Sequence, residues 1–303
     1  MLEATLYTDP GCPWAYSANP ALRVLEWRYR EQFTWRLVMI GLREEASEAA
    51  VSSFDPQRSL ARWRVFEERY GMPFGSVPKR RPSGTGRGCR AVVAAGLVEP
   101  GTEWTALRAL QLAYFTTDLL LDDAESIHAA LAGTSLDASR IVELIDDDEV
   151  VAEYERQLAE ARSAAGTPAD VQGKTALAEG RPRFTAPSVV FRRNGDSVVV
   201  AGGWQPLLAY DVLLANFEPE LERTPPPESP EPLLEYFQDG LTTAEVALLL
   251  ADGPDPVPDI EVTELLLGRL ADDGSVVREP VGAGSLWRAA PAAVGSSATR
   301  AES

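Results

Sequence analysis

Chemistry in this sequence centres on one cysteine in the stretch Asp9–Ser17, D-P-G-C-P-W-A-Y-S. Cys12 follows a turn signal and precedes residues that favour a helix start. A cysteine at a helix N-terminus faces unpaired backbone N–H groups that stabilise its thiolate. Pro13 fits the first helical turn, where its missing N–H costs nothing, and Trp14 can cover the sulfur while leaving it accessible. The pattern predicts a nucleophilic thiol at neutral pH; an inert, buried cysteine is the alternative.

A partner thiol is missing from the position where a Cys-X-X-Cys site would have it, because Ala15 stands three residues after Cys12. A second cysteine normally releases a mixed disulfide by attacking it, so here an external low-molecular-weight thiol would have to do so. The other cysteine of the chain, Cys89, is expected chiefly to pack in the interior. It is also a possible second thiol, which would require the two Cα atoms to lie within about 7 Å of each other.

Few other residues form a pattern with a chemical meaning. The loop from Lys79 to Arg87, K-R-R-P-S-G-T-G-R, is a basic cluster in an acidic protein. It leads to a helix start and could hold the carboxylates of a small anionic thiol; a solvated loop without a ligand is the alternative. The single histidine, His128, belongs to no cluster with metal-ligand spacing, so no metal site is expected.

The elements around Cys12 predict a thioredoxin-like fold. Residues 3–8 and 34–40 are β-prone and flank the cysteine turn and a helix, which gives a βαβ unit. Residues from about 45 to 180 carry mainly helical spacing. Residues 184–191 and 197–201, joined by a turn at 194–196, predict a β-hairpin, and a helix over 205–217 follows it. The predicted fold class is α/β, a thioredoxin-like fold with an inserted helical domain.

The C-terminal part predicts a second unit. Residues 1–218 form the expected thioredoxin domain, residues 219–231 a Pro- and Glu-rich linker, residues 232–290 a winged-helix-like module and residues 291–303 a disordered tail. The predicted module has twelve acidic and three basic residues between positions 231 and 290. Phosphate groups would repel it, so protein interaction or dimerisation is expected there in place of DNA binding.

Composition indicates an ordinary globular chain. The net charge of −18, from 46 acidic and 28 basic residues, argues against nucleic acid or an anionic membrane as partner. No secretory leader or membrane-spanning run is evident. Two cysteines do not form a disulfide framework. A cytoplasmic location is therefore expected.

The motif C-P-W after D-P-G, the βαβ opening, the helical block and Thr185-Ala186-Pro187 before the hairpin together resemble the DsbA-like thioredoxin family. The resemblance covers residues 3–217 in layout. It implies that Cys12 is the nucleophile, that Pro13 and Trp14 match the two residues after it in the family's motif, and that Pro187 is a cis-proline facing Cys12. These four are the expected catalytic residues, and Trp14 and Thr185 are expected to shape the site. Tyr16, Thr185, Ala186 and Arg87 are the residues expected to bind substrate.

The resemblance implies a thiol–disulfide oxidoreductase, with a single thiol because of Ala15. The same fold also resembles the kappa-class glutathione transferases and the hydroxychromene-carboxylate isomerases, which implies as alternative a thiol-dependent transferase or isomerase using a glutathione- or mycothiol-like thiol. A non-catalytic thioredoxin-fold binding protein is the third possibility. No bound cofactor is expected; a low-molecular-weight thiol would act as co-substrate, with a disulfide or an electrophile as substrate.

Overall fold

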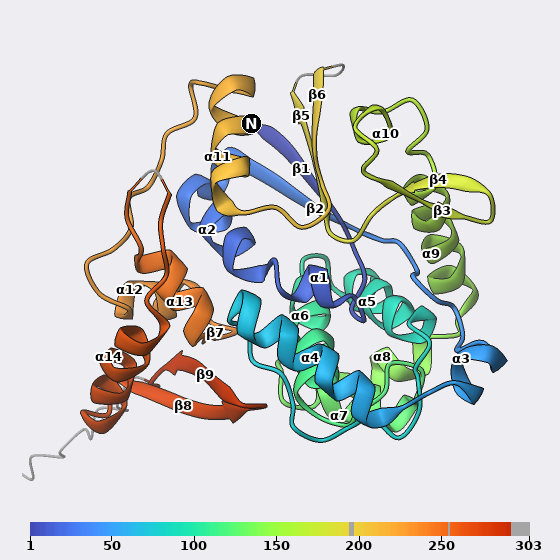
Figure 1. Cartoon of the computed structure of the whole chain (residues 1–303), viewed down its shortest axis with the longest axis horizontal. Helices are drawn as coiled ribbons and strands as arrows, with labels where there is room; N and C mark the ends of the chain where they lie inside the picture. The colour runs from blue at the N-terminus through green and yellow to red at the C-terminus, as the bar shows by residue number, and fades with distance from the viewer. Residues whose placement is uncertain (194–196, 254, 292–303) are drawn as a thin grey trace, which may run out of the picture.

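A four-stranded mixed sheet carries the N-terminal strand at its centre (Figure 1). The computed structural model describes residues 1–193, 197–253 and 255–291. The strand order is β2-β1-β5-β6, with β1 (Leu2–Thr8), β2 (Phe33–Met39), β5 (Ser188–Arg193) and β6 (Ser197–Gly202). Strand β1 pairs in parallel with β2, from Leu2 opposite Phe33 to Thr8 opposite Met39, and antiparallel with β5.

The connection from β1 to β2 contains the cysteine turn and three helices, α1 (Pro13–Tyr16), α2 (Asn19–Tyr29) and the 3-10 helix η1 (Arg30–Gln32). The helical segment expected after the cysteine turn is divided, because Pro20 lies in the first turn of a new helix that begins at Asn19. The helix α1 thus has only four residues.

Most of the helices lie between β2 and β5 in the chain, and Figure 1 shows α4 to α8 gathered on one side of the sheet. The elements are α3 (Glu48–Ser52), α4 (Pro56–Tyr70), α5 (Gly86–Val98), α6 (Glu103–Thr116), α7 (Ala124–Leu131), α8 (Ala138–Leu144), α9 (Asp148–Ala161), α10 (Pro168–Val171), β3 (Thr175–Ala178) and β4 (Arg181–Phe184). The antiparallel β3–β4 hairpin was not predicted, and the expected strand over 184–191 is interrupted at residues 185–187, between β4 and β5.

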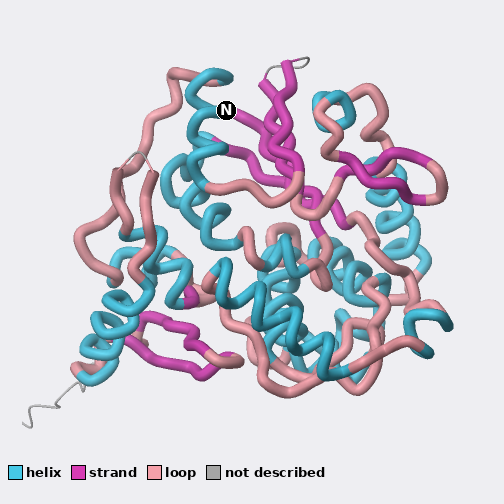
Figure 2. The backbone as a smooth tube through the Cα atoms, viewed as in Figure 1, coloured by secondary structure: helices cyan, strands magenta, loops and turns pink. Residues whose placement is uncertain are grey.

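The C-terminal part continues from α11 (Leu207–Phe217), which packs on β6. Residues 219–230 contain no helix or strand and run beside α2, where Trp27 Nε1 donates to the Pro225 carbonyl at 3.0 Å. The elements that follow are α12 (Glu231–Tyr236), β7 (Leu241–Thr242), α13 (Thr243–Leu250), α14 (Ile260–Asp272), β8 (Val276–Val281) and β9 (Gly284–Ala289). Their sheet has the order β7-β9-β8 and is separate from the first (Figure 2).

Two predicted features fall outside the described residues: the turn at 194–196 and positions 292–303 of the tail. Within the described residues, no helix is both long and apolar enough to cross a membrane. The part of the chain that the structure describes also holds no group of three or more His, Cys, Asp or Glu side chains arranged to bind a metal ion.

Candidate active site

Cys12 lies where the central strand meets the first helix. The Asp9–Gly11 turn follows β1, and Cys12 is the N-cap residue of α1, with its backbone N–H donating to the Asp9 carbonyl at 3.1 Å. The thiol Sγ donates to the carbonyl of Ala186 at 3.2 Å. The Ala186–Pro187 peptide bond is cis, as the resemblance implied. Strand β1 and the residues before β5 therefore bring Cys12 and Ala186 together, although 174 positions separate them.

The charge state of Cys12 differs from the sequence-based expectation. Burial raises the pKa of Cys12 to about 12, and the carboxylate of Asp9 adds to this, although the backbone N–H groups of Ala15 and Trp14 and the charge of Arg183 act in the opposite direction. The side chain is only 4% exposed. Desolvation of the anion thus outweighs the effect of the helix N-terminus, and the thiol is protonated at neutral pH.

This pKa predicts a particular pH dependence of alkylation. In a Cys89→Ser background, the rate of Cys12 alkylation by iodoacetamide should rise about tenfold per pH unit up to pH 10, because the thiolate fraction keeps growing. Free cysteine, measured in parallel, levels off above its pKa of about 8.5. Mass spectrometry of samples quenched over time gives both rates. A plateau for Cys12 below pH 9 would contradict the raised pKa.

A buried carboxylate, Asp9, joins three segments behind the cysteine, and sequence reasoning missed it. Asp9 is fully buried and accepts hydrogen bonds from Gly11 N, Leu42 N and Thr85 Oγ1, each at 2.8 Å. Its burial raises the pKa of the carboxyl group. The available signal was the Asp-Pro-Gly turn, in which an Asp side chain commonly bonds the backbone two residues on. Asp9 fixes the turn that carries Cys12.

Cys89 lies on the other side of Asp9. It is completely buried on α5, and its thiol Sγ donates a hydrogen bond to Asp9 Oδ2 at 3.5 Å. Burial, followed by the charge of Asp9, raises its pKa well above the usual value. Both cysteines are free thiols. Cys12 and Cys89 therefore bond to different partners, and the role of Cys89 as a second thiol stays a prediction.

A cleft of about 820 Å³ opens beside Cys12. Its walls come from the cysteine turn, the segment after β2, helix α4, the loop before α5, the end of α6 and the segment before β5. The charged residues that line it are one acid and six bases: Asp55, Arg43, Arg58, Arg62, Lys79, Arg81 and Arg183. In a protein of net charge −18, this excess of positive charge beside the thiol attracts anions.

The bases of the cleft differ in how they are held. Arg81 pairs with Asp122 at 2.7 Å. Lys79 donates to the carbonyl of Thr117 at 2.9 Å and to that of Leu119, and burial lowers its pKa to about 7. Among the described residues, Arg43, Arg58, Arg62 and Arg183 form no ion pair with a carboxylate. These four guanidinium groups therefore have no carboxylate partner among the described residues, and Arg183 Nη1 donates to the Phe184 carbonyl at 2.8 Å.

The structure brings together most, but not all, of the predicted site residues. Those that line the cleft are Cys12, Pro13, Trp14, Thr185 and Ala186; Pro187 is joined to Ala186 by the cis bond. Trp14 is 43% exposed and packs edge-on against Phe66 of α4, with ring centroids 4.9 Å apart.

Two predicted substrate-binding residues lie elsewhere. Tyr16 is fully buried, stacks on Phe115 and donates its hydroxyl to the Pro73 carbonyl at 2.8 Å. Arg87 pairs with Asp146 at 3.1 Å and does not line the cleft. In their place the cleft has Arg58, Arg62 and Arg183, which sequence reasoning missed. The signal for the first two was their spacing of four residues, which puts them on one face of a helix.

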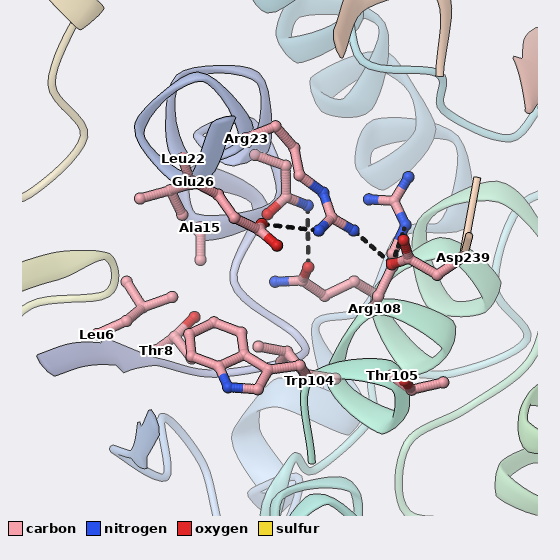
Figure 3. A pocket seen from close by; sticks show the side chains of 13 residues that line it. Leu6, Thr8, Ala15, Leu22, Arg23, Glu26, Trp104, Thr105, Arg108 and Asp239 are labelled. Atoms are coloured by element: carbon pink, nitrogen blue, oxygen red, sulfur yellow. Dashed lines mark hydrogen bonds and ion pairs between the residues drawn. The ribbon is translucent and has the colours of Figure 1, made fainter. Parts of the chain in front are cut away.

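A second, smaller cavity of about 270 Å³ lies beyond α1 (Figure 3). Ala15 lines it together with side chains of α2, α6 and the segment before β7, among them Arg23, Trp104, Arg108 and Asp239. Ala15 is 2% exposed. The position at which a Cys-X-X-Cys site has its second thiol is therefore buried and borders free volume.

The fold and the cis-proline contact of Cys12 define a thioredoxin-fold protein with a thiol site. Residues 4–185 match the family described as the DSBA-like thioredoxin domain. The chain belongs to this family, whose members are typically thiol oxidoreductases.

Solved structures share the fold at low sequence identity. One, provisionally assigned as a protein disulfide isomerase from Nitrosomonas europaea, is 17% identical, with a TM-score of 0.56 over 72% of this chain and 98% of that one. Another, provisionally assigned as a DsbA oxidoreductase from Streptomyces coelicolor, is 17% identical, with a TM-score of 0.52 over 74% of this chain and 92% of that one. The cytosolic disulfide reductase DsbM from Pseudomonas aeruginosa is 16% identical, with a TM-score of 0.47 over 65% of this chain and 88% of that one. No curated protein sequence matches the chain.

Proposed function

We propose that the protein is a thiol–disulfide oxidoreductase that uses Cys12 alone and takes its second thiol from an anionic low-molecular-weight thiol. The observation that carries the proposal is the contact of Cys12 Sγ with the carbonyl before the cis-proline, 3.2 Å away, at the edge of a cationic cleft. Ala15 supplies no resolving thiol. Family membership supports the same class of reaction.

The reaction consists of two exchanges with the same atom. Cys12 first loses its proton to solvent, because burial keeps it protonated at neutral pH. The resulting thiolate attacks one sulfur of a disulfide, so that a mixed disulfide forms and the other sulfur leaves as a thiolate. The thiolate of the small thiol then attacks the outer sulfur of the mixed disulfide, which releases a new disulfide and returns Cys12 as thiolate. One disulfide is consumed and one is formed, so the electrons balance without a further oxidant.

The cleft supports an anionic co-substrate. Arg58 and Arg62 lie on one face of α4, and Arg43 and Arg183 line the same cleft from other segments. Guanidinium groups bind carboxylates through paired hydrogen bonds. A thiol with one or two carboxylates could occupy this cleft and bring its sulfur to Cys12.

A second candidate function is thiol addition to an electrophile, or thiol-dependent isomerisation, and the raised pKa of Cys12 favours it. A protonated Cys12 can donate a hydrogen bond to the sulfur of a bound thiol and stabilise its thiolate, which then reacts itself. Cys12→Ser would keep this donor and retain turnover on an electrophile, whereas it would abolish disulfide exchange.

The formation of a mixed disulfide tests the first candidate. Incubation with oxidised glutathione at pH 9, followed by mass spectrometry of the intact protein, should add one glutathione to Cys12 in the natural protein and in Cys89→Ser. Cys12→Ser should remain unmodified, because Cys89 is completely buried. Absence of the adduct in a protein that still reacts with iodoacetamide at Cys12 would refute disulfide exchange, and absence of both would favour the non-catalytic binding protein.

We also propose the domain roles and the location that the sequence suggests. In chain order, helices occupy most of residues 45–180, and α12 to α14 followed by the β8–β9 hairpin support a winged-helix-like module over 232–290. Its acidic composition supports a protein partner or dimerisation and opposes DNA binding. Two free thiols support a cytoplasmic location.

A further inference from the structure

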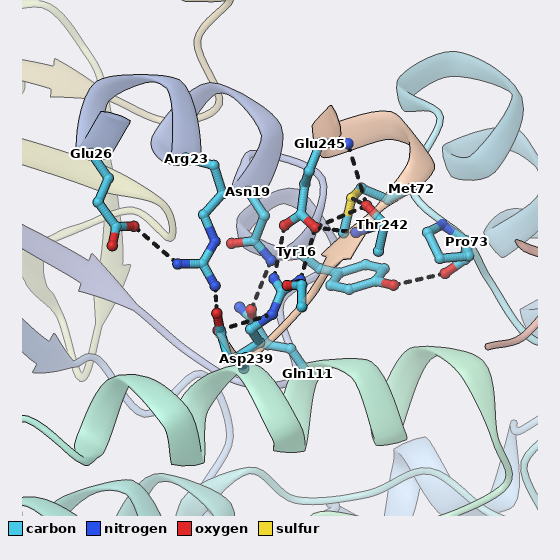
Figure 4. Close-up of polar contacts among 12 residues, drawn as sticks. Tyr16, Asn19, Arg23, Glu26, Met72, Pro73, Gln111, Asp239, Thr242 and Glu245 are labelled. Atoms are coloured by element: carbon cyan, nitrogen blue, oxygen red, sulfur yellow. Dashed lines mark hydrogen bonds and ion pairs between the residues drawn. The ribbon is translucent and has the colours of Figure 1, made fainter. Parts of the chain in front are cut away.

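A network of ion pairs connects the C-terminal elements to α2 and α6 (Figure 4). Glu245 of α13 binds Arg108 of α6 through two hydrogen bonds of 2.7 and 2.8 Å. Asp239, which precedes β7, pairs with Arg23 of α2 and lies 3.1 Å from Arg108 Nε. These contacts anchor β7 and α13 on α2 and α6, so the C-terminal elements have a defined position against the thioredoxin part.

From this anchored position the turn between β8 and β9, residues 281–284, reaches the segment that follows α4. Ala283 N donates to the carbonyl of Phe74 at 2.9 Å. A methyl group built on Gly282 would lie 2.5 Å from the same carbonyl oxygen, and Gly282 has a φ of +57°. The turn therefore approaches the backbone of Phe74 as closely as a glycine allows.

The end of α4 is contacted by the same C-terminal elements. Gly71, the C-cap residue of α4, packs under Ile260 of α14, whose Cδ1 would lie 2.6 Å from a methyl group on Gly71. Thr242 Oγ1 lies 3.4 Å from Met72 Sδ. Residues 72–75 are buried. The C-terminal elements thus contact Gly71, Met72 and Phe74 at the exit of α4.

Hydrogen bonds connect the segment around Phe74 to α4 and α6, which form part of the cleft wall. Phe74 N donates to Glu67 Oε1 of α4 at 3.3 Å, and Gly75 N donates to the Phe115 carbonyl at 2.8 Å. Arg62 and Phe66, which line the cleft, lie on the same helix as Glu67, and Phe66 packs against Trp14. A shift of Phe74 would therefore move the wall that faces Cys12.

We propose that the C-terminal elements position the wall of the active-site cleft. The β8–β9 turn, through Phe74, and Ile260 of α14, through Gly71, together hold α4 and its Arg58 and Arg62 in place beside Cys12. The proposal assigns the C-terminal elements a role in the thiol site without requiring them to bind a partner. It depends on the cleft and on the reactivity of Cys12, but not on the disulfide exchange proposed above.

Two glycines of the same region give a matched test. Gly282→Ala and Gly274→Ala both place a side chain at positive φ, +57° and +77°, but a methyl group on Gly274 meets nothing within 4 Å. The measured quantity is the ratio of the Cys12 alkylation rates with iodoacetate and iodoacetamide, in a Cys89→Ser background. The two reagents share a leaving group and differ in charge, so the ratio reports the positive charge near Cys12.

Gly282→Ala should lower this ratio by about threefold, towards that of free cysteine, because the arginines of α4 move away from the thiol. Gly274→Ala should leave it unchanged. An equal change in both variants, or no change in either, would overturn the proposal. The alkylation ratio does not depend on turnover, so the two proposals can fail separately. If disulfide exchange is absent but Gly282→Ala still lowers the ratio, only the proposed function fails. If exchange occurs but the ratio does not respond, only the positioning role fails.

A second pair of variants covers the case in which Gly282→Ala does not fold. Ile260→Ala removes the side chain that packs on Gly71, whereas Val262→Ala truncates a more exposed residue of the same helix, 59% exposed against 37%. Ile260→Ala should lower the ratio and Val262→Ala should not. Unchanged ratios in both folded variants would refute the role of the C-terminal elements.

Discussion

Arg108→Met will lower the free energy of unfolding by about 3–5 kcal/mol, the range found when one partner of a buried ion pair is removed. Arg108 is 7% exposed in its side chain, and the partner carboxylate of Glu245 is fully buried. Although burial alone would raise the pKa of Glu245, the charge and hydrogen bonds of Arg108 lower it overall. Without Arg108 the buried carboxylate keeps, among the described residues, hydrogen bonds from the amide and hydroxyl of Thr242 only, and the charge of Arg23 is the remaining nearby cation that lowers its pKa.

A double variant and a change of pH distinguish this cause from simple loss of packing. In Arg108→Met/Glu245→Gln no charge is left unpaired, and Gln can still complete the capping box that Glu245 forms with Thr242, so much of the lost stability should return. In Arg108→Met, burial without the arginine raises the pKa of Glu245 in the folded state above its unfolded value. Protonation of Glu245 then stabilises the folded state. The loss of unfolding free energy caused by Arg108→Met should therefore become smaller as the pH falls towards about 5. Urea denaturation followed by tryptophan fluorescence measures both. A loss independent of pH and undiminished in the double variant would contradict the unpaired charge.

Local sequence signals were sufficient for the frame of the site. The turn Asp9-Pro10-Gly11, Pro13 in the first helical turn and the β-rich residues on either side depend on neighbours in the chain. Strands β1 and β2 appear as expected, and a helix begins at Pro13, although it ends after four residues. The position of Pro187 opposite Cys12 was implied by the family resemblance alone. The short β3–β4 hairpin was missed because Arg181, Pro182 and Arg183 show no apolar alternation.

The remaining features depend on contacts that are distant in the chain. The pKa of Cys12 is raised because segments far from it in sequence, including the residues before β5, bury the thiol. The helix N-terminus considered alone predicts a lowered pKa. Tyr16 turns to the core because Pro73 and Phe115 come to lie there. Arg58 and Arg62 become cleft residues only through the packing of α4, which residues of the C-terminal part contact.

Ala15→Cys will change how the protein releases a mixed disulfide. Ala15 occupies the position of a resolving thiol and borders the 270 Å³ cavity, so one additional sulfur atom can be accommodated. Attack by the introduced thiol on a Cys12 mixed disulfide is intramolecular, and effective concentrations in such reactions far exceed the millimolar level of an external thiol. Release of glutathione from the preformed adduct should therefore be at least about 100-fold faster than in the natural protein without added thiol.

Two control variants show whether the thiol at position 15 causes the release of glutathione. Ala15→Ser has the same side-chain shape as Ala15→Cys, with an oxygen in place of the sulfur, so its adduct should persist as in the natural protein. If Cys89 were the resolving thiol, the adduct of the natural protein would already be short-lived, and Cys89→Ser would lengthen its life. The measurement is the glutathione liberated over time after excess reagent is removed. An adduct equally stable in Ala15→Cys and in the natural protein would mean that a sulfur at position 15 cannot reach Cys12. Rapid release from Ala15→Cys alone would show that the single substitution at position 15 makes this family member depend on an external thiol.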